Sequence, residues 1–252
     1  MARKHTTGAP HFVGVGTQRS GTTWWFETLL GHPQIRGPKG KRKEQHFFDR
    51  FCVEPMTDAD VAAYHERFRQ VPGKVTGEWT PRYMRDFWTP PLLARAAPEA
   101  KRIVMFRDPV ERFRSGVPHR IAQMPGIRAE SAVSDAIERG RYASQLKRVL
   151  AHFDAARILV LQYEKCVADP AGQYRRSLRF LGVDPDHGAA GFDALRGTTQ
   201  ATNKPPLWDD LQAGLRAALE PEVAELAALC PEIDLSLWKH FSHLTAADAL
   251  PA

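Results

Sequence analysis

A glycine-rich segment near the N-terminus carries residue types that suit anion binding. Gly16 and Gly21 permit a tight turn whose backbone N–H groups point inward. The other donors of this segment are the side chains of Arg19, Ser20, Thr22 and Thr23. A helix that follows such a turn adds its positive end to the same ligand. We therefore predict a phosphate-binding loop here; the alternative is a glycine-rich turn without a ligand.

The spacing of the two glycines is shared with the phosphate loop of nucleoside triphosphatases. The segment contains Gly-x-x-x-x-Gly, but Thr22 stands where that motif requires a lysine. The lysine neutralises the β- and γ-phosphates during transfer, so its absence disfavours an ordinary ATPase or kinase. A nucleotide kinase or NTPase that uses the same loop is kept as an alternative function.

A second group of anion-binding residue types follows an apolar run at 102–106. Asp108 is suited to cap a helix and Pro109 to its first turn, so a helix should begin there. Ser115 then lies two turns into the helix, on the face that points back to the end of the strand. Arg107 and Ser115 can therefore grip one phosphate from two sides, the arginine with two parallel hydrogen bonds. The alternative is a surface Arg107 that pairs with Asp108.

A carboxylate and a histidine follow a basic run between these two groups. Glu44 can accept a proton from a nucleophile, and His46 can do the same. Without any ligand, the basic run is solvated and Glu44 pairs with Lys43 or Arg42. A third possibility is that the basic run 36–46 binds an anionic polymer in a protein that has no catalytic activity.

Apolar runs of strand length alternate with helix-like segments along the chain. The expected strands cover residues 11–15, 74–77, 102–106 and 157–161. The expected helices cover residues 22–30, 59–70, 109–120, 131–153, 171–181 and 220–229. Such alternation predicts an α/β fold, with a single domain and a central parallel sheet flanked by helices. Ligands of such folds bind at the carboxyl ends of the strands, where both groups of anion-binding residues occur.

Length and composition fit one globular domain. The chain has 252 residues, of which 43% are hydrophobic, and a formal net charge of +6. We expect a disordered leader at residues 1–10, the domain at 11–244 and a tail at 245–252. No apolar run approaches the roughly 20 residues of a membrane span, and no secretory signal follows the first methionine. We therefore expect a cytoplasmic protein without stable membrane insertion, and the Ala- and Arg-rich composition suggests a bacterial one.

Cysteine usage and charge exclude two further classes of function. The three cysteines, Cys52, Cys166 and Cys230, form no C-x-x-C pair, so neither a disulfide framework nor a zinc site is expected. The excess of positive charge is modest, and the sequence has no helix-turn-helix or basic-aromatic RNA-binding pattern. Nucleic acid is therefore not an expected partner.

The two anion sites together resemble those of the sulfotransferases that use 3′-phosphoadenosine 5′-phosphosulfate (PAPS). Residues 19–23 are similar to their 5′-phosphosulfate loop, and Arg107 with Ser115 matches their 3′-phosphate pair. The resemblance implies a P-loop-like sulfotransferase fold, PAPS as donor, 3′-phosphoadenosine 5′-phosphate (PAP) as product, and no metal. The donor ligands that it implies are Arg19, Ser20, Gly21, Thr22, Thr23, Trp24, Arg107, Ser115 and, from a closing loop, Lys204.

The segment at 43–49 is similar to the glycosaminoglycan branch of this family, in particular the heparan sulfate glucosaminyl sulfotransferases. Lys43, Glu44 and His46-Phe47-Phe48-Asp49 match that branch residue by residue. The resemblance implies that Glu44 is the base on the acceptor hydroxyl, while His46 and Asp49 contact the acceptor or orient neighbours. Arg19 is expected to stabilise the leaving oxygen. His46 is the alternative base, as in the cytosolic small-molecule sulfotransferases.

The acceptor side of the resemblance is less complete. Residues 77–83 are similar to the family's acceptor-cleft segment, and the acceptor contacts that we expect are Lys43, Asp49, Trp79 and Arg82. Trp79 departs from the lysine often found there in the heparan enzymes, and the C-terminal part lacks their closing loop and their cysteine pair. The expected acceptor is a hydroxyl, or less favourably an amine, of a carbohydrate, a glycolipid or a secondary metabolite.

Overall fold

The fold is built on one parallel sheet, seen here in a computed structural model that describes residues 6–187 and 206–244. Its strands are β1 (Phe12–Gly16), β2 (Ile35–Arg36), β3 (Val75–Trp79), β4 (Lys101–Phe106) and β5 (Ile158–Gln162). Their order across the sheet is β2-β3-β1-β4-β5, and every pairing is parallel. The central strands are buried on both faces, which explains why the sequence shows them as continuous apolar runs. The predicted α/β class is therefore confirmed.

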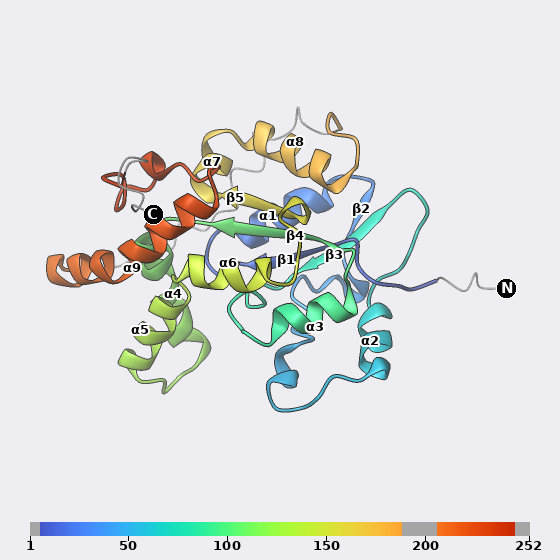
Figure 1. The fold of residues 1–252 in the computed structure, drawn as a ribbon, viewed down its shortest axis with the longest axis horizontal. Helices are drawn as coiled ribbons and strands as arrows, with labels where there is room; N and C mark the ends of the chain where they lie inside the picture. Colours follow the sequence, from blue (N-terminus) through green and yellow to red (C-terminus); the bar gives the residue numbers. More distant parts are fainter. Residues whose placement is uncertain (1–5, 188–205, 245–252) are drawn as a thin grey trace.

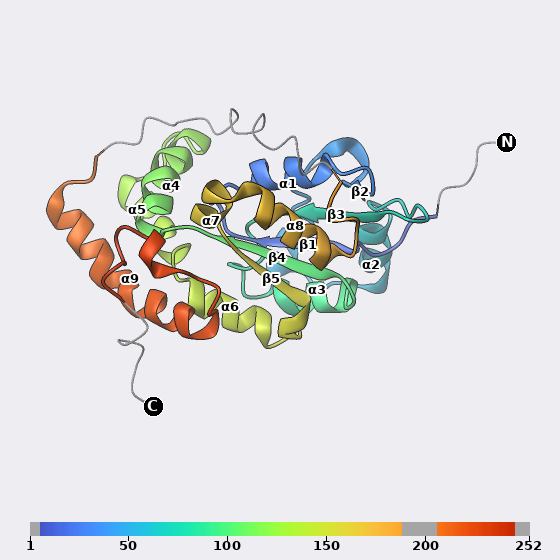
Figure 2. The same ribbon diagram turned by 90° about the horizontal axis from the view of Figure 1, so that it is seen from above.

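Helices cover both faces of the sheet. They are α1 (Thr22–Leu30), α2 (Asp58–His65), α3 (Thr89–Ala96), α4 (Pro109–Gln123), α5 (Ala129–Glu138), α6 (Tyr142–Leu150), α7 (Tyr163–Ala168), α8 (Pro170–Leu181) and α9 (Asp209–Leu229). Helices α1, α7 and α8 lie on one face, while α3 and α6 lie on the other (Figures 1 and 2). Alternate residues of β4 supply the two cores: Ile103 packs in the first and Val104 in the second.

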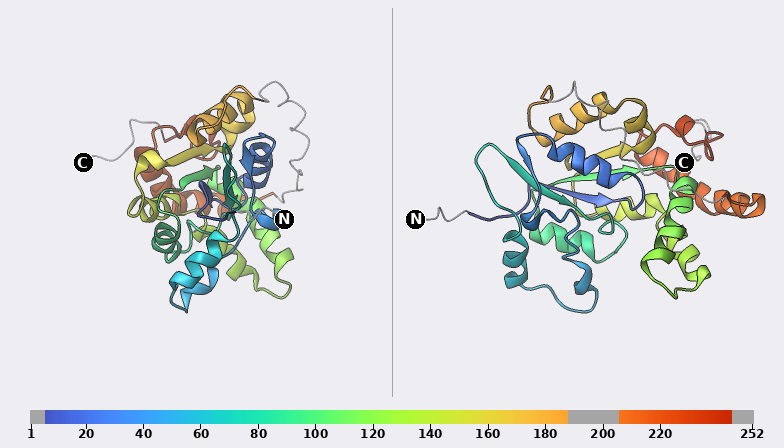
Figure 3. Two further views of the ribbon diagram at one scale, coloured as in Figure 1. Left: turned by 90° about the vertical axis from the view of Figure 1, so that its right-hand side faces the viewer. Right: turned by 180° about the vertical axis from the view of Figure 1, so that it is seen from behind.

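The carboxyl ends of the strands carry the segments of functional interest. The loop between β1 and α1 lies there, and α4 begins directly after β4. Asp108 caps α4 as predicted, since its carboxylate accepts hydrogen bonds from the N–H groups of Val110 and Glu111 at 2.9 and 3.2 Å. Helices α4, α5 and α9 gather beyond this end of the sheet (Figures 1 and 3).

Several predicted helices are wrong in their extent; the one expected at 59–70, for example, ends at His65. The segment 131–153 forms two helices, α5 and α6, which are separated at residues 139–141. A Cβ atom on Gly140 would lie 3.1 Å from Leu219 of α9, so glycine at this break allows α9 to pack closely. The last helix is also longer than expected, because it begins at Asp209 and continues through Pro221.

The N-terminal boundary of the domain also differs from our expectation. The N–H of Gly8 donates to the carbonyl of Phe68 at 3.2 Å, and that of Gln70 donates to the carbonyl of Thr6 at 2.9 Å. Residues 6–10, which we expected in a disordered leader, are therefore part of the folded domain. The expected tail at 245–252 lies outside the described residues.

The described residues contain neither a membrane-spanning helix nor a group of side chains suited to a metal ion. No helix there combines the length and the apolar character that crossing a bilayer requires. Within residues 6–187 and 206–244, no cluster of three or more His, Cys, Asp or Glu side chains is arranged to hold a metal ion.

Candidate active site

The phosphate-binding loop is fixed by buried hydroxyl groups. Thr17 Oγ1 donates to the carbonyl oxygen of Met105 on β4 at 2.8 Å and lies 2.6 Å from Ser20 Oγ. Gly21 has φ of 87°, and a Cβ atom there would lie 2.7 Å from the ring of Tyr163. Glycine is therefore needed at this position for two reasons, its backbone conformation and the close approach of an aromatic ring. The loop is a rigid cradle that leads into the N-terminus of α1.

The two predicted anion sites lie next to each other. Arg19 Nε donates to Ser115 Oγ at 2.9 Å, and Arg107 Nη1 donates to the carbonyl oxygen of Arg19 at 3.2 Å. The Arg107 guanidinium also stacks over the Tyr163 ring, 4.5 Å from its centroid. Two residues 88 positions apart in the chain thus contact each other at the carboxyl ends of β1 and β4.

The charges at this edge fit a doubly phosphorylated ligand. Burial and the positive charge of Arg107 lower the pKa of Arg19 from its usual value. Neither guanidinium lies within ion-pair distance of a carboxylate in the described part of the chain, and the buried Nε of Arg107 has no hydrogen-bond partner there. Two neighbouring cations without acidic partners are stabilised by an anion placed between them. The Arg19 loop and the Arg107–Ser115 pair therefore suit two phosphate groups of one molecule.

Buried groups support Arg107 from behind. Tyr142 OH donates to the Arg107 carbonyl oxygen at 3.0 Å. Glu164 accepts the N–H of Asp108 at 3.0 Å with one carboxylate oxygen and Nε1 of Trp238 at 2.9 Å with the other. These contacts fix the turn from β4 into α4, so Glu164 belongs to the scaffold of the site.

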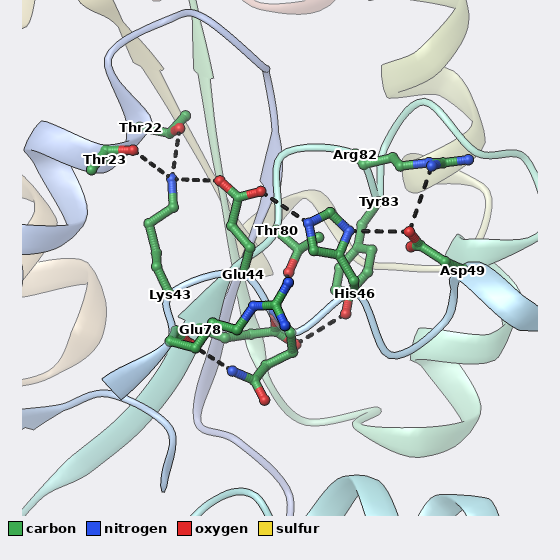
Figure 4. A network of polar contacts seen from close by, with 12 residues as sticks. Thr22, Thr23, Lys43, Glu44, His46, Asp49, Glu78, Thr80, Arg82 and Tyr83 are labelled. Atoms are coloured by element: carbon green, nitrogen blue, oxygen red, sulfur yellow. Dashed lines mark hydrogen bonds and ion pairs between the residues drawn. The ribbon is translucent and has the colours of Figure 1, made fainter. Parts of the chain in front are cut away.

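A chain of charged side chains runs from the phosphate loop to the far side of the site (Figure 4). Lys43 Nζ lies 3.1 Å from Glu44 Oε1, and Glu44 Oε2 lies 3.1 Å from His46 Nε2. The other ring nitrogen of His46 lies 3.0 Å from Asp49 Oδ2, and Asp49 in turn lies 3.5 Å from Arg82 Nη1. The predicted acceptor-side residues Lys43, Asp49 and Arg82 therefore belong to one network with both candidate bases.

The network decides the protonation of the two candidate bases. Hydrogen bonds to Asp49 and then to Glu44 raise the pKa of His46 to about 9. Burial raises the pKa of Glu44, but hydrogen bonds from His46 and Lys43 outweigh it and lower that pKa below the usual value. At neutral pH, His46 is an imidazolium that has no free lone pair, whereas Glu44 is an ionised carboxylate. Only Glu44 of this pair can accept a proton.

A buried carboxylate holds the backbone of the segment that carries both groups. Glu78 Oε2 and Thr80 Oγ1 accept the N–H of Gln45 at 3.2 and 2.9 Å, and Tyr83 OH accepts the N–H of Phe47 at 3.0 Å. The residue between these two amides, His46, has φ of 49°, which is a strained conformation for a side chain of this size. Burial raises the pKa of Glu78 to about 7. Sequence reasoning missed this support.

Two predicted ligands are placed differently from the rest. Trp79 is fully buried, and its Nε1 donates to the carbonyl oxygen of Gly16 at 3.0 Å. Its ring fills the space over Gly14, where a Cβ atom would lie 2.1 Å from it. The prediction that Trp79 contacts the acceptor is therefore wrong. Lys204 lies outside the described residues.

Two further side chains flank the site. Trp24, a predicted donor ligand, is 8% exposed and packs edge-on against Tyr163, at 6.3 Å between centroids. It therefore lies beside the ring that supports Arg107, and its contact with the donor stays a prediction. His119 of α4 was not predicted. Burial and the charge of Arg19 lower its pKa, and Glu44 acts on it in the opposite direction, so His119 lies within range of both charges.

Taken together, these features define a class of protein. A parallel sheet carries a phosphate loop at its carboxyl edge, with a second cationic site and an ionised carboxylate beside it. This is the arrangement of a group-transfer enzyme with a P-loop-like fold.

Comparisons with known proteins identify the family. The profile of the family described as "Sulfotransferase domain" matches residues 9–197. The chain is 30% identical over 188 residues to heparan sulfate glucosamine 3-O-sulfotransferase 3B1 of Mus musculus, covering 69% of this chain and 46% of that protein. It is 31% identical over 187 residues to heparan sulfate glucosamine 3-O-sulfotransferase 6 of Homo sapiens, covering 69% and 52%.

A solved structure agrees with this match over nearly the whole chain. A sulfotransferase from Alicyclobacillus acidocaldarius superimposes with a TM-score of 0.72 at 27% identity, covering 92% of this chain and 99% of that one. The chain belongs to the sulfotransferase family, which confirms the resemblance to PAPS-dependent sulfotransferases and the transferase class. It spans about half the length of the curated relatives that it matches.

Proposed function

We propose that this protein transfers the sulfuryl group of PAPS to a hydroxyl group of a carbohydrate. The observation that carries the proposal is that two neighbouring guanidiniums, Arg19 and Arg107, form no ion pair within the described residues and lie near the ionised Glu44. When bound, PAPS supplies a sulfuryl group on an oxygen whose departure leaves PAP. Arg107 and Ser115 would hold its 3′-phosphate, and the loop at 19–23 would hold its 5′ end through backbone N–H groups and hydroxyls.

Glu44 acts as the base in this proposal. Its carboxylate is 36% exposed, so an acceptor hydroxyl can reach it. As the hydroxyl oxygen attacks sulfur, Glu44 takes its proton, a contribution of about 10²–10⁴-fold in rate. His46 keeps its proton and orients Glu44 through the 3.1 Å contact. Arg19 stabilises the charge that develops on the departing oxygen.

The proposed acceptor is a carbohydrate that carries negative charge. A hollow of about 410 Å³ is lined by Arg36, Gly37, Pro38, Lys39, Gly40 and Arg69. Its three cationic side chains have no acidic partner in the described part of the chain, and residues 36–40 lead directly to Lys43 and Glu44. The two curated relatives described above are named heparan sulfate glucosamine 3-O-sulfotransferases, which supports a carbohydrate acceptor.

Transfer of labelled sulfate tests the proposal. The protein is incubated with PAPS that carries ³⁵S and, separately, with desulfated heparan sulfate, a neutral glucan, a glycolipid and a polysaccharide acetylated on its amines. We expect label in an anionic carbohydrate, no requirement for magnesium, and almost no transfer by Glu44→Gln. Magnesium-dependent turnover of ATP without sulfate transfer would instead favour the kinase or NTPase alternative. Tight polymer binding that Glu44→Gln leaves intact, without any transfer, would favour a non-catalytic binder.

A further inference from the structure

Lys43 occupies the point where the phosphate loop meets the base. Its ammonium donates to Thr22 Oγ1 at 3.2 Å and to Thr23 Oγ1 at 2.9 Å, and lies 3.1 Å from Glu44 Oε1 (Figure 4). Only 13% of its side chain is exposed. The lysine thus joins the first residues of α1 to the carboxylate that would take the proton.

Two features make this an unfavourable place for a cation when no ligand is bound. Thr22 and Thr23 open α1, and the N-terminus of a helix carries partial positive charge, which repels a cation. No acidic residue lies in the first turn of α1 to offset that repulsion. Burial also disfavours the charged form, and it lowers the pKa of Lys43. Glu44, at 3.1 Å, and Glu27 act on the pKa of Lys43 in the opposite direction and offset part of this cost. Because the two threonine hydroxyls stand at the start of α1, the ammonium can also donate to an anion bound at the mouth of the loop.

The site assembles a cation on each side of the position where the donor's 5′ end would lie. Arg19 leaves the loop toward Ser115 on α4, whereas Lys43 approaches from the segment after β2. The other titratable groups that act electrostatically on Lys43 or Glu44, or are acted on by them, are Glu27, His46 and His119. Of these, only His46 contacts Glu44 directly. Lys43 is therefore the only group in the described structure that touches both the loop hydroxyls and the proposed base.

We propose that Lys43 is a catalytic residue that donates hydrogen bonds to the sulfuryl oxygens during transfer and keeps Glu44 ionised. The inference rests on the proposed function. The bond between the acceptor oxygen and sulfur forms while the bond between sulfur and the 5′-phosphate oxygen breaks. The proton of the acceptor hydroxyl goes to Glu44, and PAP leaves with the electron pair of the broken bond. Lys43 keeps its proton throughout and balances the charge that spreads over the peripheral oxygens.

Substitution of Lys43 tests this role with three measurements. For Lys43→Met we expect turnover to fall by about a hundredfold or more. The affinity for PAP, measured by calorimetry, should change less than threefold, because PAP has no sulfuryl group. The Glu44 carboxyl, observed by ¹³C NMR without any donor and assigned with Glu44→Gln, should titrate at a higher pH. Lys43→Arg retains the charge, so its turnover should be at least tenfold higher than that of Lys43→Met. Its Glu44 carboxyl should titrate close to the wild-type pH.

A surface ion pair provides the matched control. Lys147 Nζ lies 2.5 Å from Glu225 Oε1 between α6 and α9, so Lys147→Met also removes a lysine from a carboxylate. It should leave both turnover and the Glu44 titration unchanged.

Turnover of Lys43→Met within threefold of wild type, or an unshifted Glu44 titration, would overturn the role of Lys43. If Lys43→Met does not fold, Lys43→Gln is measured in its place. A wild-type protein that binds PAP but transfers no sulfate would refute the proposed function, whereas the titration would still report on Lys43.

Discussion

The donor side and the acceptor side of the site are built by different means. On the donor side, the loop hydroxyls of Thr17 and Ser20 are 3% and 0% exposed and bond to each other and to β4. On the acceptor side, the side chains of Glu44 and Arg82 are 36% and 38% exposed, and ion pairs connect them. Buried hydrogen bonds therefore fix the first region, and ion pairs near solvent fix the second.

Because of this difference, substitutions on the two sides should change different properties, stability on one side and turnover on the other. Buried hydroxyl bonds contribute to folding because a buried group left without its partner is destabilising. Half-exposed ion pairs contribute little to folding but set the protonation of the groups that they join. Donor-side changes should therefore affect stability and nucleotide binding, whereas acceptor-side changes should affect the rate and its dependence on pH.

The largest expected effect comes from the acceptor side. Glu44→Gln removes the proton acceptor while it keeps the shape of the side chain, so turnover should fall by about 10²–10⁴-fold. The affinity for PAP should stay within threefold of wild type, because Glu44 does not contact the Arg107 site. Steady-state kinetics and calorimetry measure the two quantities. A fully active variant would transfer the role of base to another group, such as His119.

The next effect comes from the donor side and distinguishes two nucleotides. Arg107→Ala should weaken PAP binding by about tenfold to a hundredfold, as expected for the loss of a charged hydrogen bond. AMP lacks the 3′-phosphate, so its weaker binding should change much less. Calorimetry with both nucleotides measures the difference. Equal losses for PAP and AMP would show that Arg107 does not bind the 3′-phosphate.

A buried loop hydroxyl should affect folding. Thr17→Val removes the partner of Ser20 Oγ and of the Met105 carbonyl, so the free energy of unfolding should fall by about 1–3 kcal/mol. Thr23→Val is the comparison variant: Thr23 is exposed at the start of α1 and accepts a hydrogen bond from Lys43, so its effect should stay below about 1 kcal/mol. Urea unfolding measures both. Equal changes in the free energy of unfolding for the two variants would contradict the view that buried hydroxyl bonds stabilise the donor side.

The smallest expected effect is a dependence of stability on pH. The pKa of His46 is about 9 in the folded protein and near 6.5 when unfolded. A raised pKa stabilises the fold fully below pH 6.5, and this contribution is lost as the pH rises to about 9. The Tm should therefore fall more between pH 6.5 and 9.5 in wild type than in His46→Gln. Parallel pH profiles of the two proteins would contradict a protonated His46.

Much of the site could be predicted from sequence because its residues are close together in short segments. Two glycines, the hydroxyls and one arginine were enough to predict a phosphate-binding loop at 16–23. The order of the charged and aromatic residues at 43–49 was enough to predict the two candidate bases. The capping residues predicted where α4 begins, so Ser115 was expected two turns into that helix, and in the structure both Arg107 and Ser115 contact Arg19.

The roles of Glu78 and Trp79 were not predicted because they depend on contacts between segments that are distant in the sequence. Glu78 reads as a polar residue at the end of a strand, and only its bonds to Tyr64 at 2.7 Å and to Gln45 show that it supports the base-bearing segment. Trp79 is turned inward because Gly14 lies opposite it on β1 and leaves room for an indole ring. Neither pairing is visible in the order of residues along one strand.

A crystal structure of the complex with PAP tests the central claim most directly. The account predicts the 3′-phosphate within hydrogen-bond distance of Arg107 and Ser115. It also predicts the 5′-phosphate on the N–H groups of the loop at 19–23, on the side that faces Lys43 and Glu44. A nucleotide bound elsewhere, or one whose 3′-phosphate lies away from Arg107, would contradict it.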